Sequence, residues 1–325
     1  MLTHRRHWLC AAALATLSLN IAQAQNSWPE RPIRVVVPYT PGGGTDTITR
    51  HLVDKLVADT KWTLIVDNKP GAGGNVGLDM VAKARADGYT IGMGQTANLA
   101  INPALLPKMP FDPTKDLVPV ALVAEQPTVM VVRTDSPYKN LTDLVKAAKA
   151  KPEHLRQALA GNGTVGHLAG EMLALKAGFS VINVPYKGAA PAVTDLLGGQ
   201  TDYMFATPQA VLGMLKGGKL RALAVTSARR LTILPEVPTV SESGYKGFEA
   251  VDWKLVVAPA GTPAPVLKAL NAAIEKALSQ PAMHAQLSAE GSAALGGSTE
   301  KAAEYLRAEQ AEWATLIRTA KIKLD

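Results

Sequence analysis

Two glycine-rich segments hold the residues of this sequence that are best suited to chemistry. The first runs Val37-Pro38-Tyr39-Thr40-Pro41-Gly42-Gly43-Gly44-Thr45-Asp46 and links an expected strand to an expected helix. Glycines remove side chains where a backbone must approach a ligand. A helix start also presents unpaired N–H groups and the positive end of its dipole. The segment therefore predicts a cradle for an anion. The alternative is a tight turn capped by Thr45 or Asp46, which needs neither three glycines nor two prolines.

The second segment, Ala160-Gly161-Asn162-Gly163-Thr164-Val165-Gly166-His167, also follows an expected strand and opens a helix. Its glycines match the G-x-G-x-x-G dinucleotide fingerprint, which needs an acidic residue about 20 positions on, at the end of the next strand. The strand expected there runs into Pro185 without one, so we interpret this segment as a second anion cradle. His167 lies one turn into the helix. It could donate to a ligand or hold the loop through its backbone.

Motifs of catalysis are missing from the sequence. There is no G-x-S-x-G nucleophile elbow, and beyond residue 24 the chain has no cysteine. Its histidines there, His51, His154, His167 and His284, have no partner at a metal-binding spacing such as H-E-x-x-H. We therefore expect a protein that is not an enzyme, with no catalytic residue, no metal and no cofactor. A secreted hydrolase with an unrecognised pair of acids is the alternative from another class.

The N-terminus has the pattern of a secretory signal peptide. Arg5 and Arg6 precede an apolar run at 8–21, and Ala22-Gln23-Ala24 predicts cleavage before Gln25. The apolar run is shorter than the ~20 residues of a membrane span. Removing residues 1–24 lowers the net charge from +7 to +5. Aromatic residues make up only 5% of the chain and no long basic run occurs, which argues against nucleic-acid binding.

Short apolar runs alternate with helical patterns along the rest of the chain. Strands are expected at 33–37, 63–66, 89–94, 120–123, 129–132, 157–160, 180–184, 202–206, 220–226 and 253–258. Helices are expected at 45–58, 75–84, 141–150, 164–177, 189–197, 208–215, 263–278, 281–290 and 299–320, and the proline-rich stretch 102–119 predicts a loop. This alternation predicts an α/β protein with parallel sheets that are covered by helices on both faces.

The alternation occurs in two series, which predicts two lobes joined by two crossings of the chain. Residues 25–126 and 250–325 are expected to form lobe 1, and residues 127–249 lobe 2. Ligands of open α/β sheets bind outside the carboxyl ends of the strands. We therefore expect the ligand cleft between the lobes.

Several further motifs follow one another along the chain. Besides the two glycine-rich segments, they are Trp28-Pro29-Glu30-Arg31-Pro32-Ile33-Arg34, Asp67-Asn68-Lys69-Pro70-Gly71-Ala72-Gly73-Gly74-Asn75-Val76-Gly77, Asp87-Gly88-Tyr89-Thr90, Val184-Pro185-Tyr186-Lys187-Gly188, Leu234-Pro235-Glu236-Val237-Pro238-Thr239 and Ala258-Pro259-Ala260-Gly261-Thr262-Pro263. Together they resemble the Bug-type extracytoplasmic solute receptors of tripartite tricarboxylate transporters. The resemblance covers essentially the whole chain beyond residue 24.

This resemblance implies a two-lobed periplasmic binding protein type II fold with the ligand cleft between its lobes. It implies a monomeric periplasmic receptor that captures a small organic carboxylate: a dicarboxylate, a tricarboxylate or an aromatic acid. The receptor's partner would be the membrane subunits of a tripartite tricarboxylate transporter. A sensory adaptor, which would present the liganded receptor to a signalling partner, is the alternative.

The resemblance also implies ligand contacts from four loops, carried over by matching position. They include the loop at 95–98 and the stretch Ala206-Thr207-Pro208. Relatives often carry an acid at the position of Ala206, and its absence disfavours an amino-acid ligand. The implied ligand-binding residues are Tyr39, Gly42, Gly43, Gly44, Thr45, Asp46, Thr96, Asn98, Gly161, Asn162, Gly163, Thr164, His167 and Thr207.

Overall fold

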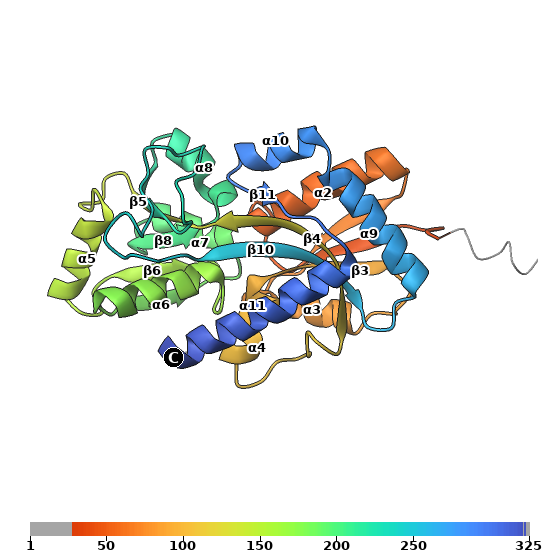
Figure 1. The fold of residues 1–325 in the computed structure, drawn as a ribbon. Helices are drawn as coiled ribbons and strands as arrows, with labels where there is room; N and C mark the ends of the chain where they lie inside the picture. Colours follow the sequence, from red (N-terminus) through yellow and green to blue (C-terminus); the bar gives the residue numbers. More distant parts are fainter. Residues whose placement is uncertain (1–27, 321, 323–325) are drawn as a thin grey trace, which may run out of the picture.

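The computed structural model describes residues 28–320 and 322, so the predicted signal peptide lies outside the described residues. Two β-sheets lie beside each other, each with helices on both faces (Figure 1). We call the six-stranded sheet with its helices the first lobe, and the five-stranded sheet with its helices the second lobe. The expected α/β class is confirmed.

The first sheet has the strand order β11-β4-β10-β3-β1-β2. Its strands β1, β2 and β3 are parallel, whereas β10 is antiparallel to both β3 and β4. The bounds are β1 Ile33–Val37, β2 Leu64–Asn68, β3 Thr90–Gln95, β4 Leu117–Pro127, β10 Val251–Pro259 and β11 Ala293–Ala294.

The second sheet has the order β7-β6-β8-β5-β9. Strand β6 is parallel to β7 and β8, but β5 is antiparallel to β8 and β9. Both sheets are therefore mixed: the expected parallel pairs are present, but β5 and β10 are antiparallel to their neighbours. Strands β4 and β10 carry the chain out of the first lobe and back, so they run in opposite directions. The bounds are β5 Val129–Arg133, β6 Arg156–Leu159, β7 Ile182–Pro185, β8 Tyr203–Ala206 and β9 Leu220–Val225.

The helices lie close to their expected positions. The second lobe contains α5 Leu141–Ala150, α6 Val165–Ala177, α7 Ala189–Leu197 and α8 Pro208–Lys216. The first lobe contains α2 Gly44–Thr60, η1 Ala72–Gly74, α3 Asn75–Ala82, η2 Ala97–Ile101, α4 Asn102–Leu105, α9 Ala264–Leu278, α10 Pro281–Ala289 and α11 Thr299–Ala320. The short helix α4 occupies the beginning of the stretch that was expected to be a loop.

The core follows from the two-residue period of the strands. In β1, Val35 packs into a core with Ile48 and Leu52 of α2, together with residues of α9 and α10. The next residue, Val36, faces the opposite core, to which α3 and α11 contribute. This second core continues into the second lobe through Met130 of β5 and residues of α5 and α6. The two lobes therefore share apolar packing along one side.

The chain crosses between the sheets at Thr128 and again between β9 and β10. These two crossings are tied together at Thr226. The Thr226 N–H donates to the Thr128 carbonyl oxygen over 2.9 Å, and the Ala250 N–H donates to the Thr226 carbonyl oxygen over 2.9 Å. The hydroxyl of Thr226 also accepts from the Thr128 N–H over 2.8 Å. Both crossings thus meet at one hydrogen-bonded point.

Candidate functional site

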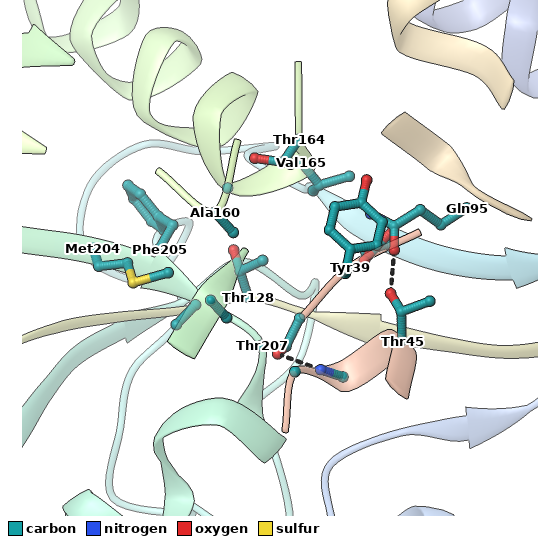
Figure 2. Close-up of a pocket in the computed structure, with 16 residues that line it drawn as sticks. Tyr39, Thr45, Gln95, Thr128, Ala160, Thr164, Val165, Met204, Phe205 and Thr207 are labelled. Carbon is teal, nitrogen blue, oxygen red and sulfur yellow. Dashed lines mark hydrogen bonds between the residues drawn. The ribbon is translucent and has the colours of Figure 1, made fainter. Parts of the chain in front are cut away.

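A cavity of about 50 Å³ lies between the two sheets, where loops of both lobes meet (Figure 2). Its walls come from the ends of β1, β3, β6 and β8 and from the start of β10, as expected for an α/β protein with its site at the strand ends. The lining residues are Tyr39, Gly43, Gly44, Thr45, Gln95, Thr128, Ala160, Thr164, Val165, Gly166, Ala189, Met204, Phe205, Ala206, Thr207 and Asp252.

Four helices begin at this cavity: α2 after Gly43, α6 after Thr164, α7 after Gly188 and α8 after Thr207. Each helix start contributes a lining residue. The N-terminus of a helix carries a partial positive charge and unpaired N–H groups. Among the described residues that line the cavity there is no Lys or Arg. The attraction that these helix starts offer to an anion therefore comes from backbone groups.

The first glycine-rich loop leaves the start of α2 open to the cavity. Gly43 is the N-cap and brings no side-chain hydrogen bond. Asp46 does not line the cavity; its Oδ2 accepts from the Gly42 N–H over 3.0 Å, and its Oδ1 accepts from Asn68 Nδ2 over 2.9 Å. Arg50 Nε donates to the same carboxylate over 3.0 Å. Asp46 thus holds the loop from behind.

These contacts also set the charge state of Asp46. Burial is the largest influence on its pKa and raises it, but the hydrogen bonds from Arg50, Asn68 and the Gly42 N–H together outweigh burial. The net effect is a pKa below the usual value for an aspartate. The carboxylate that braces the first loop is therefore ionised at neutral pH.

The second glycine-rich loop uses its own side chains to hold itself. Thr164 caps α6, accepting from the His167 N–H over 3.4 Å and donating to the Gly161 carbonyl oxygen over 2.8 Å. His167 is 3% exposed, and its Nδ1 accepts from the Gly163 N–H over 3.1 Å. A ring nitrogen that accepts carries no proton, so the ring proton is on Nε2, which lies 3.7 Å from Glu171 Oε1. Of the two roles open to His167, the loop-holding hydrogen bond is present.

The two lobes contact each other directly at the cavity. The Gly44 N–H donates to Thr207 Oγ1 over 3.2 Å, which joins the start of α2 to the start of α8 (Figure 2). The glycines of the second loop lie against the first lobe as well. A Cβ on Gly163 would come within 1.8 Å of Asn102 Oδ1, and a Cβ on Gly73 would come within 2.3 Å of the Asn162 carbonyl oxygen.

Polar side chains of the first lobe form the floor of the cavity. Gln95 accepts a short hydrogen bond from the Thr45 hydroxyl, and its N–H donates to Asn98 Oδ1 over 3.0 Å (Figure 2). Thr96 accepts from the Trp253 N–H over 2.9 Å and fixes β10 against this floor. Thr96 and Asn98 are fully buried. They contribute to the site through the hydrogen bonds that position Trp253 and Gln95.

An ion pair within β10 completes the floor. Lys254 Nζ donates to Asp252 Oδ2 over 2.5 Å, and both side chains are buried. Burial lowers the pKa of Lys254, and the carboxylate of Asp252 opposes that shift. Burial also raises the pKa of Tyr39, and the charge of Asp252 adds to the increase. The phenol of Tyr39 therefore stays protonated, and it donates to the Gly73 carbonyl oxygen over 2.6 Å.

The residues expected from the sequence divide into two groups. Those that line the cavity are Tyr39, Gly43, Gly44, Thr45, Thr164 and Thr207. Those that lie behind it and shape the loops are Gly42, Asp46, Thr96, Asn98, Gly161, Asn162, Gly163 and His167. The expected site residues did not include the other lining residues, among them Thr128, Ala189 and Asp252. For Asp252 a signal existed, because an acid and a base two residues apart in an apolar strand share one face.

Residues 28–320 and 322 contain neither a metal-binding cluster nor a membrane-spanning helix. No cluster of three or more His, Cys, Asp or Glu side chains in this part of the chain could hold a metal ion. Likewise, none of the helices described there is long and apolar enough to cross a membrane.

Two α/β lobes with a cavity between them, walled by helix starts, define a two-lobed solute-binding protein. Residues 48–322 match the family described as tripartite tricarboxylate transporter family receptor. The chain belongs to this family, as the resemblance indicated.

Relatives of known sequence and structure agree. The UPF0065 protein in the tcbD-tcbE intergenic region of Pseudomonas sp. (strain P51) is 41% identical over 315 residues, which are 96% of this chain and 94% of the relative. The periplasmic binding protein BugD is 35% identical, with a TM-score of 0.87 over 91% of this chain and 99% of its own. A protein of R. palustris with adipate is 34% identical, with a TM-score of 0.88 over 91% and 99%. The expected two-lobed fold is confirmed.

Proposed function

We propose that the protein is a periplasmic receptor that captures a small organic carboxylate and delivers it, as a monomer, to a membrane transporter of the tripartite tricarboxylate type. One observation carries this proposal: four helices begin at a cavity whose lining includes no Lys or Arg among the described residues. Such a site can bind an anion through backbone groups. The predicted signal peptide and the likeness to a periplasmic binding protein support the location.

The energetics are sufficient without a salt bridge. A micromolar dissociation constant corresponds to about −8 kcal/mol, and a hydrogen bond to a charged group contributes about 1.5–3 kcal/mol. Gly43, the N-cap of α2, has no side chain to cap the N–H groups of the first turn, although the Gly44 N–H donates to Thr207 Oγ1. Helix α8 begins with Pro208, which has no N–H, so there the hydroxyl of Thr207 takes the place of the backbone donor. About four to six such donors can reach this affinity after the cost of association is included.

The walls of the cavity favour an aliphatic ligand. Phe205, Met204 and Ala189 lie beside the helix starts and can pack against the carbon chain of an aliphatic acid. The likeness to an R. palustris protein with adipate supports a carboxylate ligand. We therefore propose an aliphatic carboxylate and place its carboxylate at the start of α2, beside Gly43, Gly44 and Thr45.

A thermal-shift screen tests this function. Residues 25–325, purified and freed of bound ligand by unfolding and refolding, are heated with malonate, succinate, adipate, citrate and benzoate. A ligand at 100 times its dissociation constant raises the free energy of unfolding by about 2.7 kcal/mol. Malonate, succinate and adipate should give larger shifts than benzoate, and NMR spectra of the ligand after incubation should be unchanged. No shift with any carboxylate would contradict the proposal, and conversion of the ligand would contradict a receptor without enzymatic activity.

A further inference from the structure

One acceptor atom in the cavity floor has no partner in the protein. Asp252 is 4% exposed and lines the cavity. Its Oδ2 pairs with Lys254, but Oδ1 is buried and makes no hydrogen bond among the described residues. A buried polar atom left unpaired carries a desolvation cost, and native proteins satisfy nearly all of them. Oδ1 can therefore accept a hydrogen bond from a molecule that occupies the cavity.

Neighbouring donors of the protein make no hydrogen bond to Oδ1. The hydroxyl of Tyr39 donates to the Gly73 carbonyl oxygen. Gln126 lies opposite Asp252 in the β4–β10 pair; its amide nitrogen is also buried without a partner among the described residues and lies beneath the first loop, 2.3 Å from where a Cβ on Gly44 would be. Oδ1 is therefore available to a donor of the ligand.

The charge beside Asp252 decides what kind of donor fits. Lys254 is fully buried, and its ammonium already neutralises the carboxylate at 2.5 Å. A ligand ammonium would place a second positive charge next to Lys254, and like charges in a buried site repel strongly. A second ligand carboxylate would bring an anion against an unpaired acceptor. A neutral hydroxyl donates without adding charge.

We propose that Asp252 is a specificity-determining residue that selects a hydroxy acid. Its Oδ1 accepts a hydrogen bond from a ligand hydroxyl, while the ligand's carboxylate lies at the start of α2. This inference rests on the proposed function, because it assumes a bound carboxylate. Lys254 is a positioning residue: it fixes the Asp252 side chain and keeps the site unsuited to an amino group.

Calorimetric titration with three matched acids tests the assignment. Succinate, malate and aspartate share a four-carbon dicarboxylate skeleton and differ at one carbon, which carries hydrogen, hydroxyl or ammonium. The wild-type protein should bind one enantiomer of malate about 10- to 100-fold more tightly than succinate, the range of a hydrogen bond to a charged acceptor. Aspartate should bind more weakly than malate.

Two variants connect the preference to the ion pair. Asp252→Ala with Lys254→Met removes the acceptor without leaving a buried ammonium unpaired, and the ratio of succinate to malate dissociation constants should fall to about one. Lys254→Met alone keeps the carboxylate and removes the competing charge, so the binding of aspartate relative to malate should increase. Circular dichroism and melting curves establish that each variant is folded. If a variant does not fold, the comparison of the three ligands on the wild-type protein still tests whether the site prefers a hydroxyl group.

The outcomes separate the two proposals. Equal binding of succinate and malate by the wild-type protein overturns the role of Asp252 and leaves the carboxylate receptor intact. Tighter binding of aspartate than of malate overturns the hydroxyl assignment, and a malate preference that persists in the double variant places the hydroxyl elsewhere. If no carboxylate binds at all, both proposals fail.

Discussion

The two glycine-rich loops have similar sequences but use their hydrogen bonds differently. At the first loop, α2 begins at Gly43 without a side-chain cap, and the nearby acid, Asp46, faces back into the loop. At the second loop, Thr164 caps α6 and His167 holds Gly163. The first loop therefore leaves donors for a ligand, whereas the second uses some of its own to keep its shape. A glycine-rich strand-to-helix turn can serve binding or architecture.

The largest effect on carboxylate binding should come from a substitution of Gly43, because a side chain there can affect the ligand without disturbing the fold. Gly43 has an ordinary extended backbone (φ −82°), and a Cβ there would meet only Ala189 Cβ at 3.7 Å and the Thr40 carbonyl oxygen at 3.9 Å. We expect Gly43→Val to fold normally and to weaken carboxylate binding at least ~100-fold, about 2.7 kcal/mol, because its branched side chain intrudes between the lobes. Calorimetry measures the affinity.

The matched control is Gly43→Ala, whose single methyl group fits in ordinary contact and should cost far less affinity. Near-normal binding by Gly43→Val would show that the first loop does not hold the ligand. The proposed difference between a ligand-binding first loop and a structural second loop would then be wrong.

A substitution in the second loop should lower the stability of the protein. Gly163 has φ +71°, and a Cβ would lie 1.8 Å from Asn102 Oδ1. Gly163→Ala should therefore lower the free energy of unfolding by about 1–3 kcal/mol through backbone strain alone, as measured by urea denaturation. A ligand in excess should recover part of the loss by mass action. If Gly163→Ala reduced affinity without reducing stability, the second loop would share the binding role of the first.

The smallest effect concerns Asp46 and depends on pH. Its pKa in the folded protein lies below the unfolded value of about 3.9. A group of this kind contributes stability above the unfolded pKa and loses it as pH falls through the folded pKa. The wild-type protein should therefore lose stability below about pH 4, and Asp46→Asn should be less stable at pH 7 with a shallower decline. Urea denaturation at pH 7 and pH 3 compares them, and identical slopes would remove Asp46 as the brace of the first loop.

The sequence predicted those parts of the fold that depend on local pattern. The expected ranges of β1, α5, α7 and α11 coincide with the observed ones, because apolar periodicity, glycines and prolines act within a few residues. The antiparallel direction of β5 and β10 was not predictable in this way. It depends on where the chain crosses between sheets, which no local pattern records.

The site was predictable to a similar degree. The glycine loops were located because a strand, glycines and a helix follow one another in the sequence. Asp252 was missed because the expected strand began at Trp253, one residue after it, which hid its alternation with Lys254. The proposed role of Asp252 also depends on the burial of its side chain, which is known only from the folded structure.

The hydrogen bonds at Thr226, where the two crossings of the chain meet, have a mechanical consequence. They fasten one crossing of the chain to the other beside Thr128 and Ala250, so they restrict how the two lobes can rotate relative to each other. Thr128 also lines the cavity. A molecule in the cavity would therefore lie beside the segment that joins the lobes, where its contacts act directly on the connection between them.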